Sequence, residues 1–144
     1  MAVVRTGFRS MRLGITDQGD TQSHSFINQE VTIPEDAVSA TLSFWYYPIS
    51  QDTLQYDWQE AQILDANLDL LAQVMRVNSN SQTWTQPPSF DLTPYKGQTI
   101  VVYFNVYNDG VADLKTAMYL DDMSIQVCGS TIRVYLPLLL KSRQ

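Results

Sequence analysis

The stretch Ala40-Thr41-Leu42-Ser43-Phe44-Trp45-Tyr46-Tyr47 alternates two kinds of side chain along its length. Successive side chains on a β-strand point to opposite faces of the sheet, so the stretch predicts a strand with two distinct faces. The more apolar set is the predicted core face: Ala40, Leu42, Phe44 and Tyr46. The opposite face carries Thr41, Ser43, Trp45 and Tyr47.

Two further stretches show the same period of two. In residues 98–107 the predicted core face carries Ile100, Val102, Phe104 and Val106, and the outer face carries Val101, Tyr103, Asn105 and Tyr107. In residues 57–65 the core face carries Ala61 and Ile63, which places Trp58, Glu60 and Gln62 outside. If these strands share one sheet with residues 39–48, its outer face mixes aromatic rings with amide and carboxyl groups.

Period two continues through almost the whole chain, and the apolar spacing typical of helices is hard to find. Turn-forming sequences such as Asp17-Gln18-Gly19-Asp20 and Asn108-Asp109-Gly110 separate the strand-like segments. The pattern predicts strands at 8–15, 22–33, 39–48, 57–65, 70–77, 84–92, 98–107 and 116–127. We therefore expect an all-β fold, an antiparallel two-sheet jelly-roll β-sandwich of about eight strands.

Composition limits the class of protein. The chain of 144 residues is 44% hydrophobic and 11% aromatic, which suits one domain with a real core. Nine basic and fifteen acidic residues give a net charge of −6 without any stripe of Lys and Arg, which argues against nucleic acid as a partner. No run approaches the roughly 20 apolar residues of a membrane span. The single cysteine, Cys128, excludes an intramolecular disulfide.

Two adjacent acids interrupt the last predicted strand, in Tyr119-Leu120-Asp121-Asp122-Met123-Ser124-Ile125. Uninterrupted alternation places Asp121 on one face with Tyr119, Met123 and Ile125, and so aims one carboxylate into an apolar layer. A buried carboxylate needs a counter-charge or hydrogen-bond donors. The candidates are a metal ion, Arg12, or nearby backbone and hydroxyl donors.

Several segments together resemble a family of bacterial extracellular modules. The opening Arg5-Thr6-Gly7-Phe8-Arg9-Ser10-Met11-Arg12-Leu13-Gly14 is similar to the H-S-G-x-x-S-x-R-L-G segment of these jelly-roll domains. Agreement continues in Val31-Thr32-Ile33-Pro34, Ile63-Leu64-Asp65, Trp84-Thr85-Gln86, residues 40–47, residues 91–99 and residues 119–124. The chain thus resembles the galactose-binding-like, MAM-like and carbohydrate-binding sandwiches that accompany secreted peptidases, glycoside hydrolases and surface proteins.

The resemblance implies a structural calcium ion near the start of the chain and the last strand. Its matching position here is Asp121, and the nearest further candidates in motif order are Asp17 and Asp20 with carbonyls of the 16–21 loop. Calcium takes about six to eight oxygen ligands, so one or two aspartates do not complete a site. The alternative is that Asp121 is satisfied by protein donors alone.

The outward aromatic and polar side chains are the candidate ligand-binding residues: Trp45, Tyr47, Trp58, Glu60, Gln62, Tyr103, Asn105 and Tyr107. Flat rings suit sugar stacking, and amides or acids suit sugar hydroxyls, so a polysaccharide or a cell-surface glycan is the expected class of partner. The competing interpretation is that these rings pack under the 48–57 loop or under the C-terminal segment.

Catalysis has little support in the sequence. His24 is the only histidine and reads as a solvent-facing strand residue, while Asp52, Asp57 and Glu60 are explained as solvated loop and strand acids. We expect a non-catalytic accessory or adhesion module of a secreted bacterial protein. The first alternative is a carbohydrate-binding module, and the second is a hydrolase or a hydrolase fragment.

The chain divides into a domain at residues 1–128 and an extension at residues 129–144. The apolar extension predicts either an edge strand, to which Pro137 is suited, or a spacer toward another part of a parent chain. Its residues 131–140, with Leu138 to Leu140, are also candidates for self-association. The direct run of Met1-Ala2-Val3-Val4 into strand-like sequence favours a module of a longer chain, secreted or at the cell surface.

Overall fold

The computed structural model describes residues 3–129, 133–137 and 141–143. The strands of the described residues are β1 (Met11–Gly14), β2 (Ser23–Thr32), β3 (Ser39–Ser50), β4 (Trp58–Asp65), β5 (Leu70–Val77), β6 (Phe90–Asp91), β7 (Thr99–Asn108), β8 (Thr116–Cys128), β9 (Arg133–Pro137) and β10 (Lys141–Arg143). Helical structure in this part of the chain is confined to the 3₁₀ turn η1 (Thr93–Tyr95). None of the described residues forms a helix that is long and apolar enough to cross a membrane.

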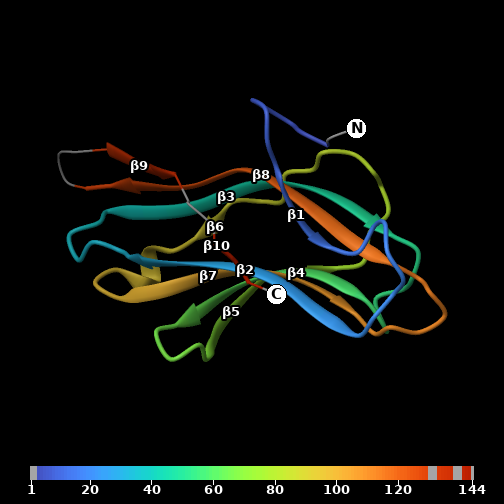
Figure 1. The fold of residues 1–144 in the computed structure, drawn as a ribbon. Coiled ribbons are helices and arrows are strands. Elements are labelled where there is room, and N and C mark those ends of the chain that lie inside the picture. Colours follow the sequence, from blue (N-terminus) through green and yellow to red (C-terminus); the bar gives the residue numbers. More distant parts are fainter. Residues whose placement is uncertain (1–2, 130–132, 138–140, 144) are drawn as a thin grey trace.

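Two antiparallel sheets pack face to face (Figure 1). The first has the strand order β1-β8-β3-β6, with β9 also paired to β8, and the second has the order β10-β2-β7-β4-β5. In chain order the first eight strands alternate between the sheets except at β4 and β5, which pair with each other, and the two strand orders are those of a jelly roll. The predicted all-β jelly-roll sandwich is confirmed.

Two predicted strands are shorter than expected. The segment predicted at 8–15 forms a ladder only at Met11–Gly14, where β1 pairs with β8. The segment predicted at 84–92 keeps one bridge between Tyr46 and Thr85, followed by the short strand β6. Pro87 and Pro88 lie between them and have no N–H to donate to a ladder, which accounts for the interruption.

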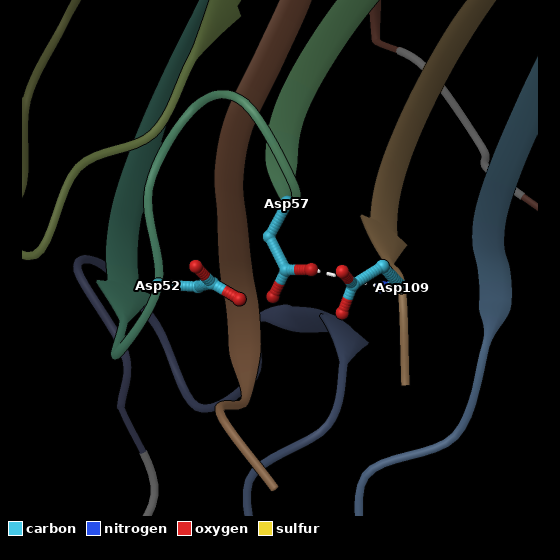
Figure 2. Close-up of side chains that lie close together, drawn as sticks. All are labelled: Asp52, Asp57 and Asp109. Carbon is cyan, nitrogen blue, oxygen red and sulfur yellow. Dashed lines mark hydrogen bonds between the residues drawn. The ribbon is translucent and has the colours of Figure 1, made fainter. Parts of the chain in front are cut away.

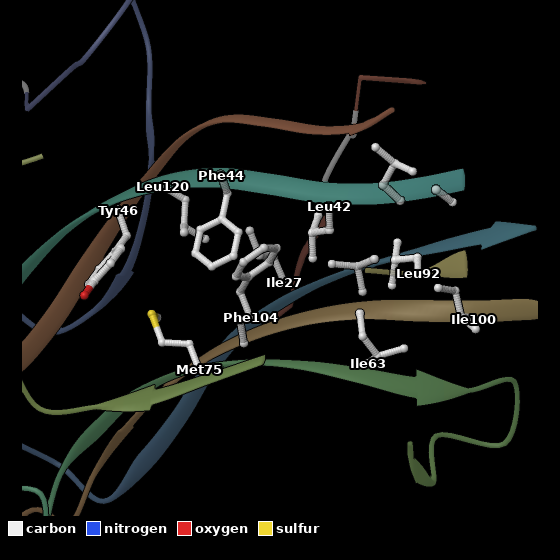
Figure 3. Packing of buried hydrophobic residues seen from close by; sticks show 14 of the residues in the cluster. Ile27, Leu42, Phe44, Tyr46, Ile63, Met75, Leu92, Ile100, Phe104 and Leu120 are labelled. Carbon is white, nitrogen blue, oxygen red and sulfur yellow. The ribbon is translucent and has the colours of Figure 1, made fainter. Parts of the chain in front are cut away.

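The core lies between the two sheets and contains the predicted inward residues of β3, β4 and β7 (Figure 3). Phe44 of one sheet meets Phe104 of the other edge to face, with ring centroids 4.9 Å apart. Both rings are almost fully buried. Side-chain alternation on these three strands therefore follows the sequence pattern, and the opposite sides of the same strands belong to the outer faces of the two sheets.

The C-terminal segment joins both sheets. β9 pairs antiparallel with residues 124–128 of β8, and β10 pairs with residues 26–28 of β2. Both strands occupy edge positions, which is compatible with Pro137 at the end of β9. Leu138 to Leu140, the centre of the predicted self-association segment, lie outside the described residues.

Candidate functional site

The outer face of the β2-β7-β4-β5 sheet gathers six of the eight predicted ligand-binding residues. In the β4–β7 ladder Trp58 lies opposite Tyr107, Glu60 opposite Asn105, and Gln62 opposite Tyr103. Residues directly opposite each other in an antiparallel pair share a face. These aromatic, amide and carboxyl side chains therefore form one continuous patch, as the alternation predicts.

Trp45 and Tyr47 belong to the other sheet, so the expectation of one shared outer face is corrected. β3 pairs with β8 and β6, and not with β4 or β7. The guanidinium carbon of Arg5 lies 3.8 Å from the centroid of the Trp45 ring, and Tyr47 packs edge to face against Trp84 and Tyr119. The sequence pattern fixes the face of each strand but not the sheet to which the strand belongs.

A cavity of about 470 Å³ opens on the β2-β7-β4-β5 face. Its described lining consists of His24, Phe26, Asn28, Glu60, Gln62, Leu64, Leu68, Leu70 and Tyr103. This volume falls within the range of small-molecule sites, roughly 300–1,000 Å³. The apolar walls come from Phe26, Tyr103 and the leucines, and the polar groups come from the middle of the sheet.

Six lining residues are absent from the predicted site. His24, Phe26 and Asn28 come from β2, which pairs with β7, and the leucines come from β4 and the β4–β5 hairpin. The three β2 residues are spaced two positions apart, so the sequence alone indicates that they share one face of a strand. That this face adjoins Tyr103 and Asn105 follows only from the pairing of β2 with β7.

Glu60 is the buried acid of this cavity, with 6% of its surface exposed. Its Oε1 accepts a hydrogen bond from Nδ2 of Asn105 at 2.8 Å, and its Oε2 accepts one from Nε2 of Gln62 at 3.3 Å. Gln62 also donates to Oε1 of Gln73 on β5 at 3.0 Å. Amides on three strands therefore fix the position of this carboxylate.

Asn105 also fixes the ring of His24. Its Nδ2 lies 3.0 Å from Nδ1 of His24, and its side chain is fully buried. A carboxylate accepts only, so Glu60 requires the donor end of the Asn105 amide to face it. Nδ1 of His24 is then the acceptor, and the proton of the neutral ring lies on Nε2.

Aromatic stacking forms the far end of the patch. The rings of Trp58 and Tyr107 are stacked with centroids 4.3 Å apart, and the guanidinium carbon of Arg76 lies 3.8 Å from the centroid of the Trp58 ring.

Burial, with the nearby Glu60 charge, raises the pKa of Tyr103 to about 12. The Tyr103 hydroxyl therefore stays protonated at neutral pH and is available as a hydrogen-bond donor.

Asp121 is buried and Asp122 is exposed, as expected, but Asp121 lies on the outer face of its sheet and not on the core face that uninterrupted alternation predicts. Asp121 lies opposite Trp45, whereas Ile125 lies opposite Leu42, and the register shifts between these two pairs. Asp122 sits in this β-bulge with a φ of +50°. One extra residue in the strand reverses the face of everything that follows, so Asp121 joins the outer face while Ile125 joins the core.

Protein donors satisfy Asp121. Its Oδ2 accepts the backbone N–H groups of Arg5 and Thr6 at 3.0 and 3.2 Å, and its Oδ1 accepts that of Asp122 at 2.8 Å. Arg5 and the Thr6 hydroxyl bind Asp122. Arg12 bonds elsewhere, to Thr16 and Asp17. Backbone donors, one of the sequence alternatives, hold this carboxylate by fastening the N-terminal segment to the bulge.

The structure brings together a different group of acids. In the part of the chain that the structure describes, one set of three carboxylates has ligand oxygens within 4.8 Å of one another, namely Asp52, Asp57 and Asp109 (Figure 2). This set does not include Asp121, Asp17 or Asp20. It is a group that can hold a metal ion, whereas the calcium expected at Asp121 stays a prediction.

Asp57 is the central member of the cluster, and it is fully buried rather than loop-solvated as expected. Its Oδ2 accepts the Thr116 hydroxyl at 2.7 Å, and its Oδ1 accepts the backbone N–H of Asp109 at 2.9 Å. Burial raises the pKa of Asp57, the two hydrogen bonds oppose that effect, and the charges of Asp52 and Asp109 add to it.

The raised pKa of Asp57 predicts a pH dependence of stability. Because its pKa is higher in the folded than in the unfolded state, the ionised side chain costs stability above the folded pKa. That cost disappears as pH falls through the folded pKa toward the unfolded value of about 3.9. We expect the wild type to gain stability relative to Asp57→Asn as the pH is lowered, measured by urea unfolding from pH 7 to pH 4.

Asp113 provides the control of opposite sign. The backbone N–H of Asp20 at 2.9 Å and Nζ of Lys115 at 3.2 Å lower its pKa. Its stabilising contribution is present above the unfolded pKa and is lost as pH falls through the folded pKa. The wild type should therefore lose stability relative to Asp113→Asn below the unfolded pKa of about 3.9, which urea unfolding extended from pH 4 to pH 2 measures. Parallel pH trends for the two variants would contradict the assignment for Asp57.

No family model matches this chain, and no curated protein matches it. Two antiparallel sheets in jelly-roll order are compatible with a jelly-roll-like module, which is the coarse part of the predicted resemblance.

Proposed function

We propose that this chain is a non-catalytic, carbohydrate-binding accessory module of a secreted or cell-surface protein. The cavity on the outer face of the β2-β7-β4-β5 sheet carries the proposal. Phe26 and Tyr103 offer apolar area for a sugar ring, and Asn28, Glu60 and His24 offer hydrogen bonds to hydroxyl groups. Apolar walls with a few fixed polar groups are the usual makeup of a small-molecule site.

The cavity has a single carboxylate among its described lining residues, which favours sugar binding over glycoside hydrolysis as its function. Glycoside hydrolysis usually takes two carboxyl groups, about 5–9.5 Å apart, on either side of the scissile bond. Among the described lining residues Glu60 is the single carboxylate. Asp52, Asp57 and Asp109 form a separate cluster, which is not part of this lining. Incubation with a polysaccharide that the chain binds should therefore release no reducing ends.

A larger hollow of about 560 Å³ lies between β5 and residues 85–90 and is a weaker candidate. Its described lining includes Pro87, Pro88 and Met75, and its one charged lining residue, Arg76, is stacked on Trp58. The polar groups there do not converge on a buried carboxylate. The cavity at Glu60 is therefore the site to test first.

Tyr103→Ala is expected to weaken sugar binding about tenfold or more, because it removes an aromatic wall worth about 1.5–3 kcal/mol when buried. A glycan array identifies a bound sugar, and calorimetry with that sugar gives the affinities. Tyr47→Ala is the matched control, since Tyr47 is a half-buried tyrosine on the outer face of the other sheet. No bound glycan across a broad array, or an equal loss in both variants, would refute this assignment.

A further inference from the structure

Glu60 is a buried charge without a cationic partner among residues 3–129. The ion pairs of this part of the chain are Arg5–Asp122, Arg12–Asp17 and Lys115–Asp113. Two amide hydrogen bonds, from Asn105 and Gln62, are the contacts of the Glu60 carboxylate. A carboxylate has about four acceptor positions, so this one retains capacity toward the cavity that it lines.

The cation directly opposite Glu60 in the β4–β5 ladder is directed elsewhere. Arg76 is the cross-strand partner of Glu60 and shares its face of the sheet. Its guanidinium nevertheless lies over the Trp58 ring rather than on Glu60. A buried charge is costly unless it is paired. A positively charged group of a ligand therefore gains more binding free energy beside Glu60 than a neutral group does.

The rest of the cavity suits a cation attached to an apolar ring. None of its described lining residues is Lys or Arg, and Glu60 is the charged one. The rings of Phe26 and Tyr103 lie beside each other with centroids 5.4 Å apart. Aromatic faces attract a desolvated cation, and they also pack against the apolar face of a sugar.

We propose that the ligand of this cavity is an amino sugar whose ammonium group binds Glu60 while its ring lies against Phe26 and Tyr103. This inference rests on the proposed carbohydrate-binding function. Glu60 is then the residue that determines specificity, and Asn105 and Gln62 position its carboxylate. A uronic acid would place a second carboxylate against Glu60 and be rejected, and an N-acetylated sugar would lose the charge but keep the ring.

The test compares three oligosaccharides of equal length on the full chain by calorimetry: a glucosamine oligomer with its amines protonated, the N-acetylglucosamine oligomer, and an oligogalacturonate. The ammonium group adds a positive charge opposite the Glu60 carboxylate, and the N-acetyl amide has no such charge. We therefore expect the glucosamine oligomer to bind at least about tenfold tighter than the N-acetylated one. We expect the oligogalacturonate not to bind.

Two variants localise the effect. Glu60→Gln should abolish the preference for the amine, whereas Glu30→Gln should keep it, because Glu30 is an exposed acid on the same sheet outside the cavity. Equal affinity of the wild type for the two glucosamine-based oligomers, or a preference that survives in Glu60→Gln, would overturn the inference and leave sugar binding standing. Failure to bind any glycan on the array would overturn the proposed function and this inference with it.

Discussion

Gln59→Leu is expected to lower the free energy of unfolding by about 3 kcal/mol or more, because several buried polar groups lose their partners at once. Gln59 is fully buried at the start of β4. Its Nε2 lies 3.1 to 3.2 Å from the carbonyl oxygens of Ile49, Ser79 and Ala117, and its Oε1 accepts the backbone N–H of Ser79 at 2.9 Å. One side chain thus connects the two sheets and the loop after β5.

Gln73→Leu is the matched control for this prediction. Gln73 donates to the carbonyls of Ala61 and Met75 and accepts from Gln62, yet its side chain is exposed. Water replaces lost partners at an exposed position, so we expect a change of about 0.5 kcal/mol or less. Urea unfolding of both variants measures the contrast. Equal losses would show that burial does not set the cost.

Gln59→Glu sharpens the same test without a change of size. An ionised glutamate only accepts hydrogen bonds, so it would face the carbonyl oxygens of Ile49, Ser79 and Ala117 with no donor. Protonation restores one O–H donor. We therefore expect this variant to be less destabilised relative to the wild type at pH 4 than at pH 7.

Gly14→Ala is expected to have an effect of similar size, about 3 kcal/mol, from backbone strain and overpacking together. Gly14 has a φ of +86°, in the left-handed region that favours glycine. A Cβ added there would lie 2.3 Å from the carbonyl oxygen of Thr116 and 2.8 Å from the Cα of Ala117. These are backbone atoms of β8, so the contact cannot be relieved by turning a side chain.

Gly97→Ala separates strain from overpacking. Gly97 also has a positive φ, +77°, but an added Cβ would meet nothing closer than the Glu35 side chain at 3.6 Å. Only the backbone strain of about 1 kcal/mol is then expected. Thermal and urea unfolding of both variants measure the difference. A loss in Gly14→Ala no larger than in Gly97→Ala would contradict the close approach of β1 to β8.

The alternation of side chains along single strands predicts which residues of the candidate site point outward. The outward positions of Trp58, Glu60 and Gln62 are visible in the sequence because a strand repeats every two residues. Their proximity to Tyr103, Asn105 and Tyr107 depends on the pairing of β4 with β7. Pairing joins residues 41 to 49 positions apart, and no local pattern encodes that neighbour relation.

Asp121 shows where parity itself fails. The left-handed conformation of Asp122 inserts one extra residue into β8 and reverses the alternation. The adjacent acids mark the place, but the sequence reads equally well as an unbroken strand. Gln59 shows the same limit. Its inward position can be predicted from alternation along β4, but its hydrogen-bond partners on three other segments cannot.

The fold class, the core faces of β3, β4 and β7 and the exclusion of an intramolecular disulfide can all be read from the sequence, because they depend on composition and on a period of two. Which strands are neighbours becomes known from the folded chain alone. That arrangement separates Trp45 and Tyr47 from the cavity, brings His24, Phe26 and Asn28 into its lining, and buries Glu60. Hydrophobic alternation is a property of one strand and determines which of its faces is buried. The neighbours of a strand depend on side-chain packing and backbone pairing across the whole sandwich.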